Sequence, residues 1–354
     1  MRRLLAISLL GISCLANAID FSEKERQAIL QHGPWPPPAR PDPSNRVSGK
    51  PEAIAFGERL FFEPRLSGPG SVLCATCHAP GRAFQDGKPR AFGLAQVERN
   101  TPSVLNVRYA RWFGWDGAHD SLWSQSIRPL LEPKEMNASA AQVMAAVNRL
   151  FPADYRKVFK EEPSEPETVL ANVGKALAAY QETLVTGRTP FDQFRDALQK
   201  GEVEGKYPPA AQRGLRVFVG KGGCASCHSG PAFTNGDFAA TKIAFAADDS
   251  GRLAGIKKLK SNQFNLLGRY NDDPSRSTAA GTRDLEARPG NAGEFRVPSL
   301  RNAANTAPYM HDGSLATLGE VLRRHSQGLA ESEIADLVAF LESLSEEPRA
   351  RGQH

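Results

Sequence analysis

The chain has 354 residues and a formal net charge of +5, with 44 lysine and arginine residues against 39 aspartate and glutamate residues. No basic tract suited to nucleic acid stands out, so the sequence predicts no nucleic-acid partner. The length fits roughly two domains.

The first 18 residues are organised like a secretory signal peptide. After a basic start (MRR), residues 4–15 are apolar but too short to span a bilayer, and residues 16–18 read Ala-Asn-Ala, a cleavage pattern. We therefore expect export to the periplasm, signal removal near Ala18, and no membrane span in the mature chain. Cys14 leaves a lipoprotein signal as an alternative, although the preceding residues match a lipobox poorly.

Residues 19–45 are predicted to form an N-terminal helix followed by a proline-rich strap. Ser22 and Glu25 have the spacing of a capping box, which favours a helix start. Residues 36–43 contain many prolines and should be extended. A second helix is predicted over residues 52–62, directly before the first cysteine motif.

Two short segments, residues 74–78 and 224–228, read Cys-Ala-Thr-Cys-His and Cys-Ala-Ser-Cys-His. C-x-x-C-H is the attachment motif of a c-type haem, in which the thiols bond to the porphyrin and the histidine binds the iron. A zinc knuckle or a thioredoxin-like dithiol is the alternative, but two copies in a chain expected to be exported favour haem. The predicted haem-binding residues are Cys74, Cys77, His78, Cys224, Cys227 and His228.

The order of helix, haem motif, loops and helices occurs twice. This order predicts a mainly α fold with two cytochrome c-like domains, each around one covalently bound haem: residues 46–200 and residues 201–354. Further helices are predicted at 140–150, 166–186, 191–200, 210–219, 317–325 and 331–344. The glycine-rich segment 238–294 shows no strong periodicity and is expected to form turns or a hairpin.

Several runs outside the haem motifs resemble the bacterial di-haem cytochrome c peroxidase and MauG family. They are residues 60–67 (LFFEPRLS), 99–106 (RNTPSVLN), 113–117 (FGWDG), 135–136 (EM), 297–302 (VPSLRN) and 307–313 (APYMHDG). They occur in the family's order over roughly residues 50–345. The resemblance implies an enzyme whose N-terminal haem reacts with hydrogen peroxide and whose C-terminal haem transfers electrons.

The same resemblance assigns roles to four residues around the N-terminal haem. Glu135 matches the distal acid–base residue, because splitting a peroxide bond requires moving a proton between its oxygens; the alternative is an ordinary surface glutamate. Trp115 matches the relay between the haems, or is a buried aromatic anchor. Gln125 matches a residue that hydrogen-bonds peroxide or water, and Pro129 matches a residue that shapes the distal wall. For each of them the alternative is a simple packing role.

The resemblance also implies a calcium ion between the haems. Asn100, Thr306 and the backbone carbonyl of Pro308 fall on the family's ligand positions. A hard cation prefers such oxygen ligands, with water completing its shell.

The sequence departs from many di-haem peroxidases at two positions. No histidine lies between His78 and His119, so the residue that caps the first resting iron in those enzymes is missing. We therefore expect an open or water-filled sixth site at the N-terminal haem, as in MauG. At the distal position of the second haem, peroxidases have methionine and MauG has tyrosine, whereas this chain has His325. His325 is the predicted second ligand, Met310 is its rival, and a solvent-facing histidine is the third interpretation.

The leading functional interpretation is a periplasmic, peroxide-dependent oxidoreductase whose high-valent di-haem state oxidises a partner, such as a protein tryptophan. Residues 33–36 (GPWP) and His325 also resemble methanobactin-associated enzymes, which act on a copper-binding protein. The alternative is a cytochrome c peroxidase that reduces hydrogen peroxide to water with electrons from a small cytochrome or cupredoxin. A second alternative is a non-catalytic di-haem electron carrier.

Overall fold

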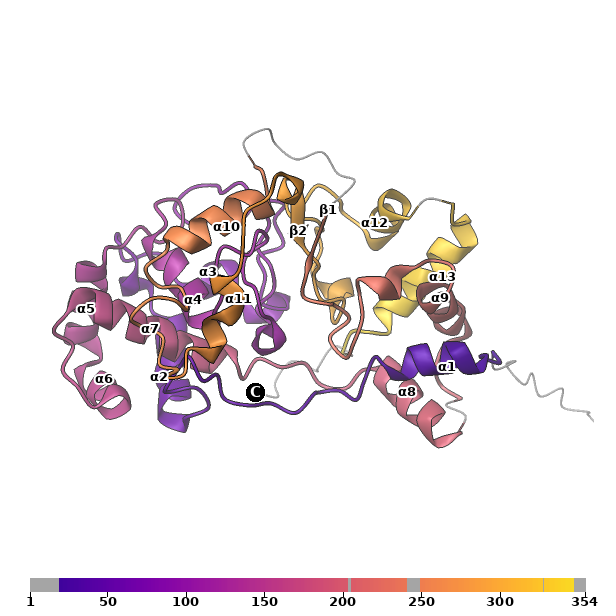
Figure 1. The fold of residues 1–354 in the computed structure, drawn as a ribbon, viewed down its shortest axis with the longest axis horizontal. Helices are drawn as coiled ribbons and strands as arrows, with labels where there is room; N and C mark the ends of the chain where they lie inside the picture. Colours follow the sequence, from indigo (N-terminus) through magenta and orange to yellow (C-terminus); the bar gives the residue numbers. More distant parts are fainter. Residues whose placement is uncertain (1–18, 203–204, 241–248, 327, 347–354) are drawn as a thin grey trace, which may run out of the picture.

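The computed structural model describes residues 19–202, 205–240, 249–326 and 328–346 and has two helical lobes joined by long loops (Figure 1). Among these residues the only sheet is a two-stranded antiparallel ladder, which pairs β1 (Phe238–Ala240) with β2 (Glu294–Arg296). The predicted mainly α fold is therefore confirmed. The predicted signal peptide lies outside the described residues.

The N-terminal lobe is built around α7 (Pro166–Gln181), which is buried along most of its length. α2 (Pro51–Phe61), α4 (Leu122–Leu131) and α5 (Ala140–Leu150) pack against it, and α6 (Pro152–Phe159) packs beside α2 and α5. The helices approach closely where side chains are absent. A Cβ at Gly57 would lie 1.9 Å from Ala176 O, so α2 and α7 need glycine there.

The C-terminal lobe repeats this arrangement with fewer helices. α9 (Pro209–Val219) crosses α13 (Glu331–Glu342), and α12 (Leu318–His325) packs beside α13. Gly214 allows the crossing, because a Cβ there would lie 2.0 Å from Asp336 O. In each lobe the haem motif follows one of these helices. The first motif forms α3 (Cys74–Cys77) after α2, and the second forms η4 (Cys224–Ser226) after α9.

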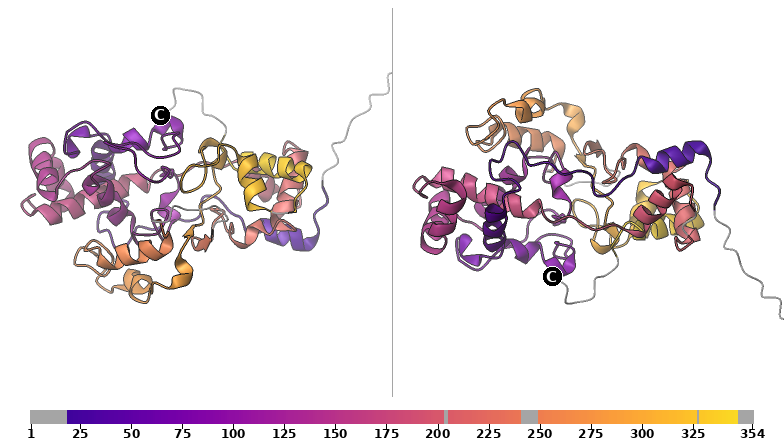
Figure 2. Two further views of the ribbon diagram at one scale, coloured as in Figure 1. Left: turned by 90° about the horizontal axis from the view of Figure 1, so that it is seen from above. Right: turned by 90° about the horizontal axis from the view of Figure 1, so that it is seen from below.

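The two hydrophobic cores use segments from both sides of residue 200. α1 (Glu23–Leu30) and α8 (Pro190–Lys200) contribute to the core of the C-terminal lobe. Conversely, α10 (Arg252–Ser261) and α11 (Ala280–Arg283) lie along the N-terminal lobe, as Figure 2 shows. The predicted division at residue 200 stays a prediction, but a cut there would separate side chains that share a core.

The predicted N-terminal strap links the lobes. It is extended as expected, and its Trp35 is buried at the joint. Trp35 Nε1 donates to Thr186 O at 2.9 Å, and its ring lies 3.8 Å from the Arg301 guanidinium carbon. The capping box of Ser22 and Glu25 is also present, which confirms the predicted start of α1.

The remaining predicted helices lie within a few residues of the observed ones, but α4, α6, α10 and α11 were not predicted. α10 shows why: it buries Arg252 and Gly255 as well as Ile256 and Leu259, so it carries no clear apolar stripe. The short 3-10 helices are η1 (Pro64–Leu66), η2 (Pro80–Arg82), η3 (Val107–Tyr109), η5 (Ser277–Ala279), η6 (Pro289–Asn291) and η7 (Ala303–Asn305).

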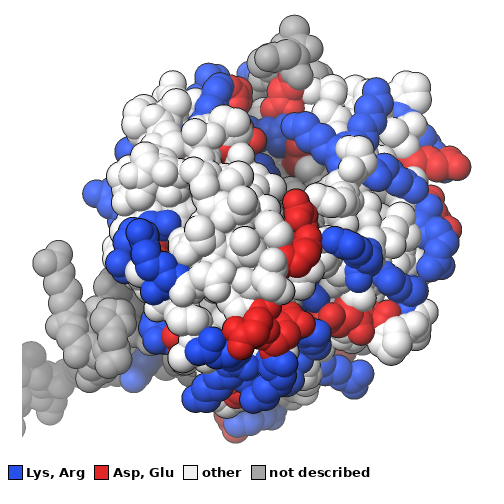
Figure 3. Space-filling model, turned by 90° about the vertical axis from the view of Figure 1, so that its left-hand side faces the viewer, with Lys and Arg blue, Asp and Glu red and all other residues white. Residues whose placement is uncertain are grey.

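No helix of the described part of the chain is long and apolar enough to span a bilayer. On the outer end of the N-terminal lobe, lysine and arginine side chains are interspersed with aspartate and glutamate side chains (Figure 3). This face therefore lacks the continuous basic surface that binds a phosphate backbone.

Candidate haem cavity and active site

A single cavity of about 1360 Å³ extends between the lobes and reaches both haem motifs. It is lined by every residue to which the sequence assigned a site role: Cys74, Cys77, His78, Asn100, Trp115, Gln125, Pro129, Glu135, Cys224, Cys227, His228, Thr306, Pro308, Met310 and His325. The structure thus brings together residues that are up to about 250 positions apart in sequence, as a two-haem site requires.

The two motif histidines are oriented as iron ligands. His78 Nδ1 lies 3.1 Å from Phe84 O, and His228 Nδ1 lies 3.1 Å from Phe233 O. A carbonyl can only accept, so each Nδ1 must carry the proton and each Nε2 keeps its lone pair for a metal. Burial lowers the pKa of both imidazoles, that of His228 to about 4, which keeps them neutral and able to bind iron.

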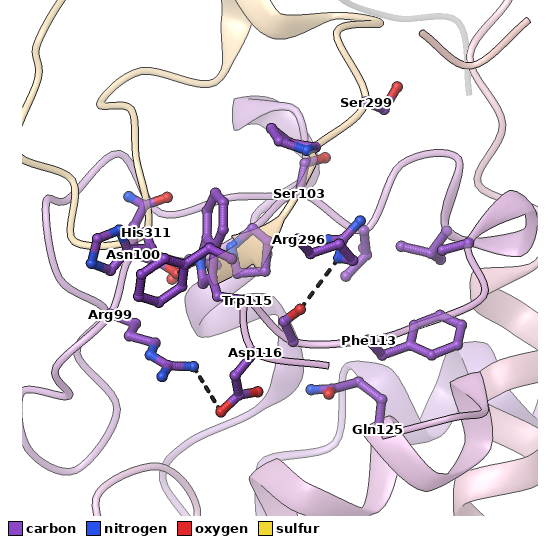
Figure 4. Close-up of a pocket in the computed structure, with 18 of the residues that line it drawn as sticks. Arg99, Asn100, Ser103, Phe113, Trp115, Asp116, Gln125, Arg296, Ser299 and His311 are labelled. Carbon is purple, nitrogen blue, oxygen red and sulfur yellow. Dashed lines mark hydrogen bonds and ion pairs between the residues drawn. The ribbon is translucent and has the colours of Figure 1, made fainter. Parts of the chain in front are cut away.

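The same device supports both histidines. Phe84 and Phe233 have left-handed backbones, with φ of 56° and 53°, an uncommon conformation for a bulky residue. The preceding carbonyl of each accepts a 2.6 Å hydrogen bond from a serine, Ser103 or Ser299 (Figure 4). These serines hold the loops whose carbonyls orient the histidines.

The cysteines fit covalent attachment rather than a zinc site. The four described cysteines are all free, and burial raises the pKa of the Cys74 thiol to about 12 and that of Cys77 to about 11. Zinc needs about four thiolate, imidazole or carboxylate ligands close together. In the described ranges no three histidine, cysteine, aspartate or glutamate residues are grouped to hold a metal. The described part of the chain thus offers no grouped set of zinc ligands, which favours the haem interpretation over a zinc knuckle.

Glu135 lies in the turn that follows α4. Its Oε1 is 2.7 Å from Arg128 Nη2, and its side chain is 16% exposed. The turn packs against Gly93, where a Cβ would lie 2.8 Å from Glu135 Cα. Arg128 lies in the last turn of α4, and its ion pair fixes the direction in which the Glu135 carboxylate points. The sequence analysis did not predict this partner.

Gln125 and His119 form another part of this wall. Gln125 Oε1 is buried and has no hydrogen-bond partner among the described residues, so it can accept from a molecule in the cavity. His119 Nδ1 lies 3.0 Å from Ser124 Oγ, and burial lowers its pKa to about 3, which keeps the ring neutral.

Trp115 connects the two halves of the chain (Figure 4). Its Nε1 donates to Asn100 O at 2.9 Å, and its carbonyl accepts from Arg296 N at 2.8 Å. Asn100 N in turn donates to His311 O at 2.8 Å. His311 stacks on Phe295 with ring centroids 3.7 Å apart, which agrees with a structural role.

The predicted calcium ligands lie on the same network. Asn100 Nδ2 donates to Lys88 O at 2.9 Å, so its other amide atom, an oxygen, is available to a cation. Thr306 and Pro308 line the same cavity. A site built from these residues would use neutral oxygens, which weakens calcium binding relative to carboxylates.

The distal wall of the second haem contains both predicted candidates. His325 is the last residue of α12, and Met310 lies in the loop before it with φ of 74°. Burial is the main cause of the lowered pKa of His228, and the charge of His325 lowers that pKa further. His325 and His228 both line the cavity.

An internal repeat relates the two distal walls. At one constant separation, Ser103 matches Ser299, and Asn106 matches Asn302 with φ of 64° and 62°. α4 and α12 begin at matching residues, each capped by a side chain (Ser121 or Thr317). The eighth residue of α4 is Pro129, and the eighth residue of α12 is His325.

The chain belongs to the di-haem cytochrome c peroxidase and MauG family. The family model described as "Di-haem cytochrome c peroxidase" matches residues 51–200. The MauG protein of Methylorubrum extorquens is 38% identical over 85% of this chain and 80% of its own length. A cytochrome-c peroxidase of Denitromonas iodatirespirans is 32% identical over 85% of this chain and 83% of its length.

Solved structures agree. A MauG-like protein associated with microbial copper homeostasis matches with a TM-score of 0.67 and 28% identity, over 89% of this chain and 96% of that chain. A di-haem peroxidase of Burkholderia thailandensis matches with a TM-score of 0.66 and 26% identity, over 87% of each chain. Two cytochrome c-like domains, two haems and a peroxide-dependent oxidoreductase activity are thereby confirmed. The reaction involves hydrogen peroxide and a redox partner or substrate.

Proposed function

We propose that this enzyme reacts with hydrogen peroxide at the N-terminal haem and passes the oxidising equivalents to a partner protein in the periplasm. The haems supply the redox chemistry when bound. The observation that carries the proposal is the difference between the matched distal positions, Pro129 and His325. Proline offers no nitrogen that can bind iron, whereas histidine does, so one wall leaves room for a small oxidant and the other can close its haem.

The residues beside Pro129 can manage the proton of a peroxide. The Glu135 carboxylate can take a proton from one oxygen of the peroxide and return it to the other. Arg128, at 2.7 Å, holds this carboxylate in place. The unpartnered Gln125 Oε1 can accept a hydrogen bond from the bound molecule. Trp115, held at both its indole nitrogen and its carbonyl, is positioned as the relay between the two ends of the cavity.

Glu135→Gln tests this assignment. The substitution keeps the shape but removes the carboxylate that can accept and donate a proton, so the rate of reaction with peroxide should fall about 10²–10⁴-fold while the resting spectrum changes little. Stopped-flow absorbance of the oxidised holoprotein mixed with hydrogen peroxide measures the rate. Glu132→Gln, in the same turn and on the same cavity, is the matched control. An unchanged rate in Glu135→Gln would remove Glu135 from the mechanism.

A second candidate function is a cytochrome c peroxidase that reduces peroxide to water with electrons from a small cytochrome or cupredoxin. It is favoured by the relatives named cytochrome-c peroxidase, which match the chain almost as fully as MauG does. Turnover with peroxide and a reduced cytochrome c or cupredoxin separates the two functions. Rapid turnover supports the peroxidase, whereas slow turnover with a persistent oxidised state supports oxidation of another partner.

For the partner we favour a copper-binding protein, whose tryptophan would be the group oxidised. The support is the likeness to a MauG-like protein associated with microbial copper homeostasis, together with the strap segment around Trp35 and His325. The basic and apolar start of residues 1–18 supports the periplasmic location.

We further propose one calcium ion at Asn100, Thr306 and the carbonyl of Pro308. Asn100→Ala should lower the calcium content from about one ion per two haems to nearly none, because it removes the side-chain oxygen of the site. The backbone carbonyl that accepts from Trp115 remains in this variant. Metal analysis after dialysis, with and without a chelator, measures this. Asn148→Ala is the control, since Asn148 donates to Pro163 O and neither residue lines the cavity. Equal calcium in both variants would place the ion elsewhere.

A further inference from the structure

Arg296 is a half-buried cation in the cavity wall beside Trp115 (Figure 4). It is the last residue of β2, and its backbone N donates to Trp115 O. Its Nε donates to Gly114 O at 3.2 Å. This fixes one edge of the guanidinium and leaves the donors of its two terminal nitrogens for another acceptor.

The other buried or partly buried arginines of this cavity have carboxylate partners. Arg99 pairs with Asp116 and Asp249, and Arg301 pairs with Asp192. No carboxylate within the described ranges pairs with Arg296, and burial alone lowers its pKa to about 10. A charge removed from most of its water is disfavoured unless a counter-charge lies beside it. An anion bound in the cavity beside Arg296 would supply the missing counter-charge.

We propose that Arg296 binds a propionate carboxylate of one of the two haems. Each haem brings propionates into the cavity, and these are the anionic groups of its periphery. A guanidinium matches a carboxylate with two parallel hydrogen bonds, which a lysine cannot reproduce. The proposal rests on the two haems of the family, and not on the oxidation of a partner protein.

The ion pair has an electrostatic consequence. A positive charge close to a haem favours the reduced form, because reduction adds an electron to the haem. Loss of the charge should therefore lower the midpoint potential of that haem. The same β2 segment holds Trp115 at its carbonyl, so the cation and the relay residue are fixed to one another.

Spectroelectrochemical titration of the holoprotein tests the inference. Arg296→Gln should shift one of the two midpoint potentials to a more negative value, and Arg296→Lys should shift it less because the charge remains. Arg90→Gln is the control, since Arg90 is an exposed cation that also lines the cavity. Potentials in Arg296→Gln equal to those of the wild type, or to those of Arg90→Gln, would overturn the proposal.

Two further measurements keep the test decisive. If an anion from solution were the partner, adding acetate or chloride would shift the wild-type potentials but not those of Arg296→Gln, and this result would also overturn the proposal. If Arg296→Gln does not fold with both haems, resonance Raman spectra of the wild type and Arg296→Lys decide. The propionate bending band should move in the variant, and an unmoved band would refute the assignment.

Discussion

Replacing Pro129 with histidine should close the N-terminal haem and suppress its reaction with peroxide. In the internal repeat, Pro129 has the position of His325, at the eighth residue of matched helices that begin at capped, matched residues. A histidine at 129 would thus place its imidazole against the N-terminal haem in the way that His325 is proposed to face the C-terminal haem. If the new ligand occupies the iron 99% of the time, the rate falls about 100-fold, because only the open fraction reacts.

Optical and electron paramagnetic spectra of the oxidised protein measure the change. The wild type should show one high-spin and one low-spin haem, and Pro129→His should show two low-spin haems. Pro129→Ala is the control, because it removes the ring without offering a ligand, and it should stay high-spin. A high-spin signal that persists in Pro129→His would show that α4 and α12 do not present equivalent positions to their haems.

The sequence predicted most of the helices near the haem motifs because their apolar periodicity and caps are local signals. It could not predict α10, whose burial of Arg252 depends on partners far along the chain: the carbonyls of Asp116 and Gly117 accept from that guanidinium. For the same reason it did not assign α1 and α8 to the C-terminal core. Core membership is a property of the folded chain, not of a local pattern.

The candidate site was predictable where a residue type is dictated by chemistry, as in the haem motifs. The residues that orient the histidines were missed because a serine and a backbone carbonyl leave no such mark. A signal was nevertheless present: the pattern Pro-Ser-x-x-Asn occurs both at 102–106 and at 298–302. Comparing those two runs would have indicated the repeat, and with it the equivalence of Pro129 and His325.

His325→Ala should convert the C-terminal haem from low spin to high spin, whereas Met310→Ala should leave it low-spin. His325 ends α12 and lines the same cavity as His228. Met310 lies instead in a loop with a left-handed backbone, tied by the backbone pairing of Tyr309 with Leu315. The low-spin signal in oxidised spectra of each variant is the measurement.

The reverse outcome, with low spin lost only in Met310→Ala, would assign the ligand to methionine and remove the proposed contrast between the two walls. His325→Met separates ligation from packing, because a thioether can also bind iron but raises the reduction potential relative to imidazole. If His325 is the ligand, this variant should stay low-spin with a higher midpoint potential. If His325 only packs, the potential of the second haem should be nearly unchanged, since its true ligand would be untouched.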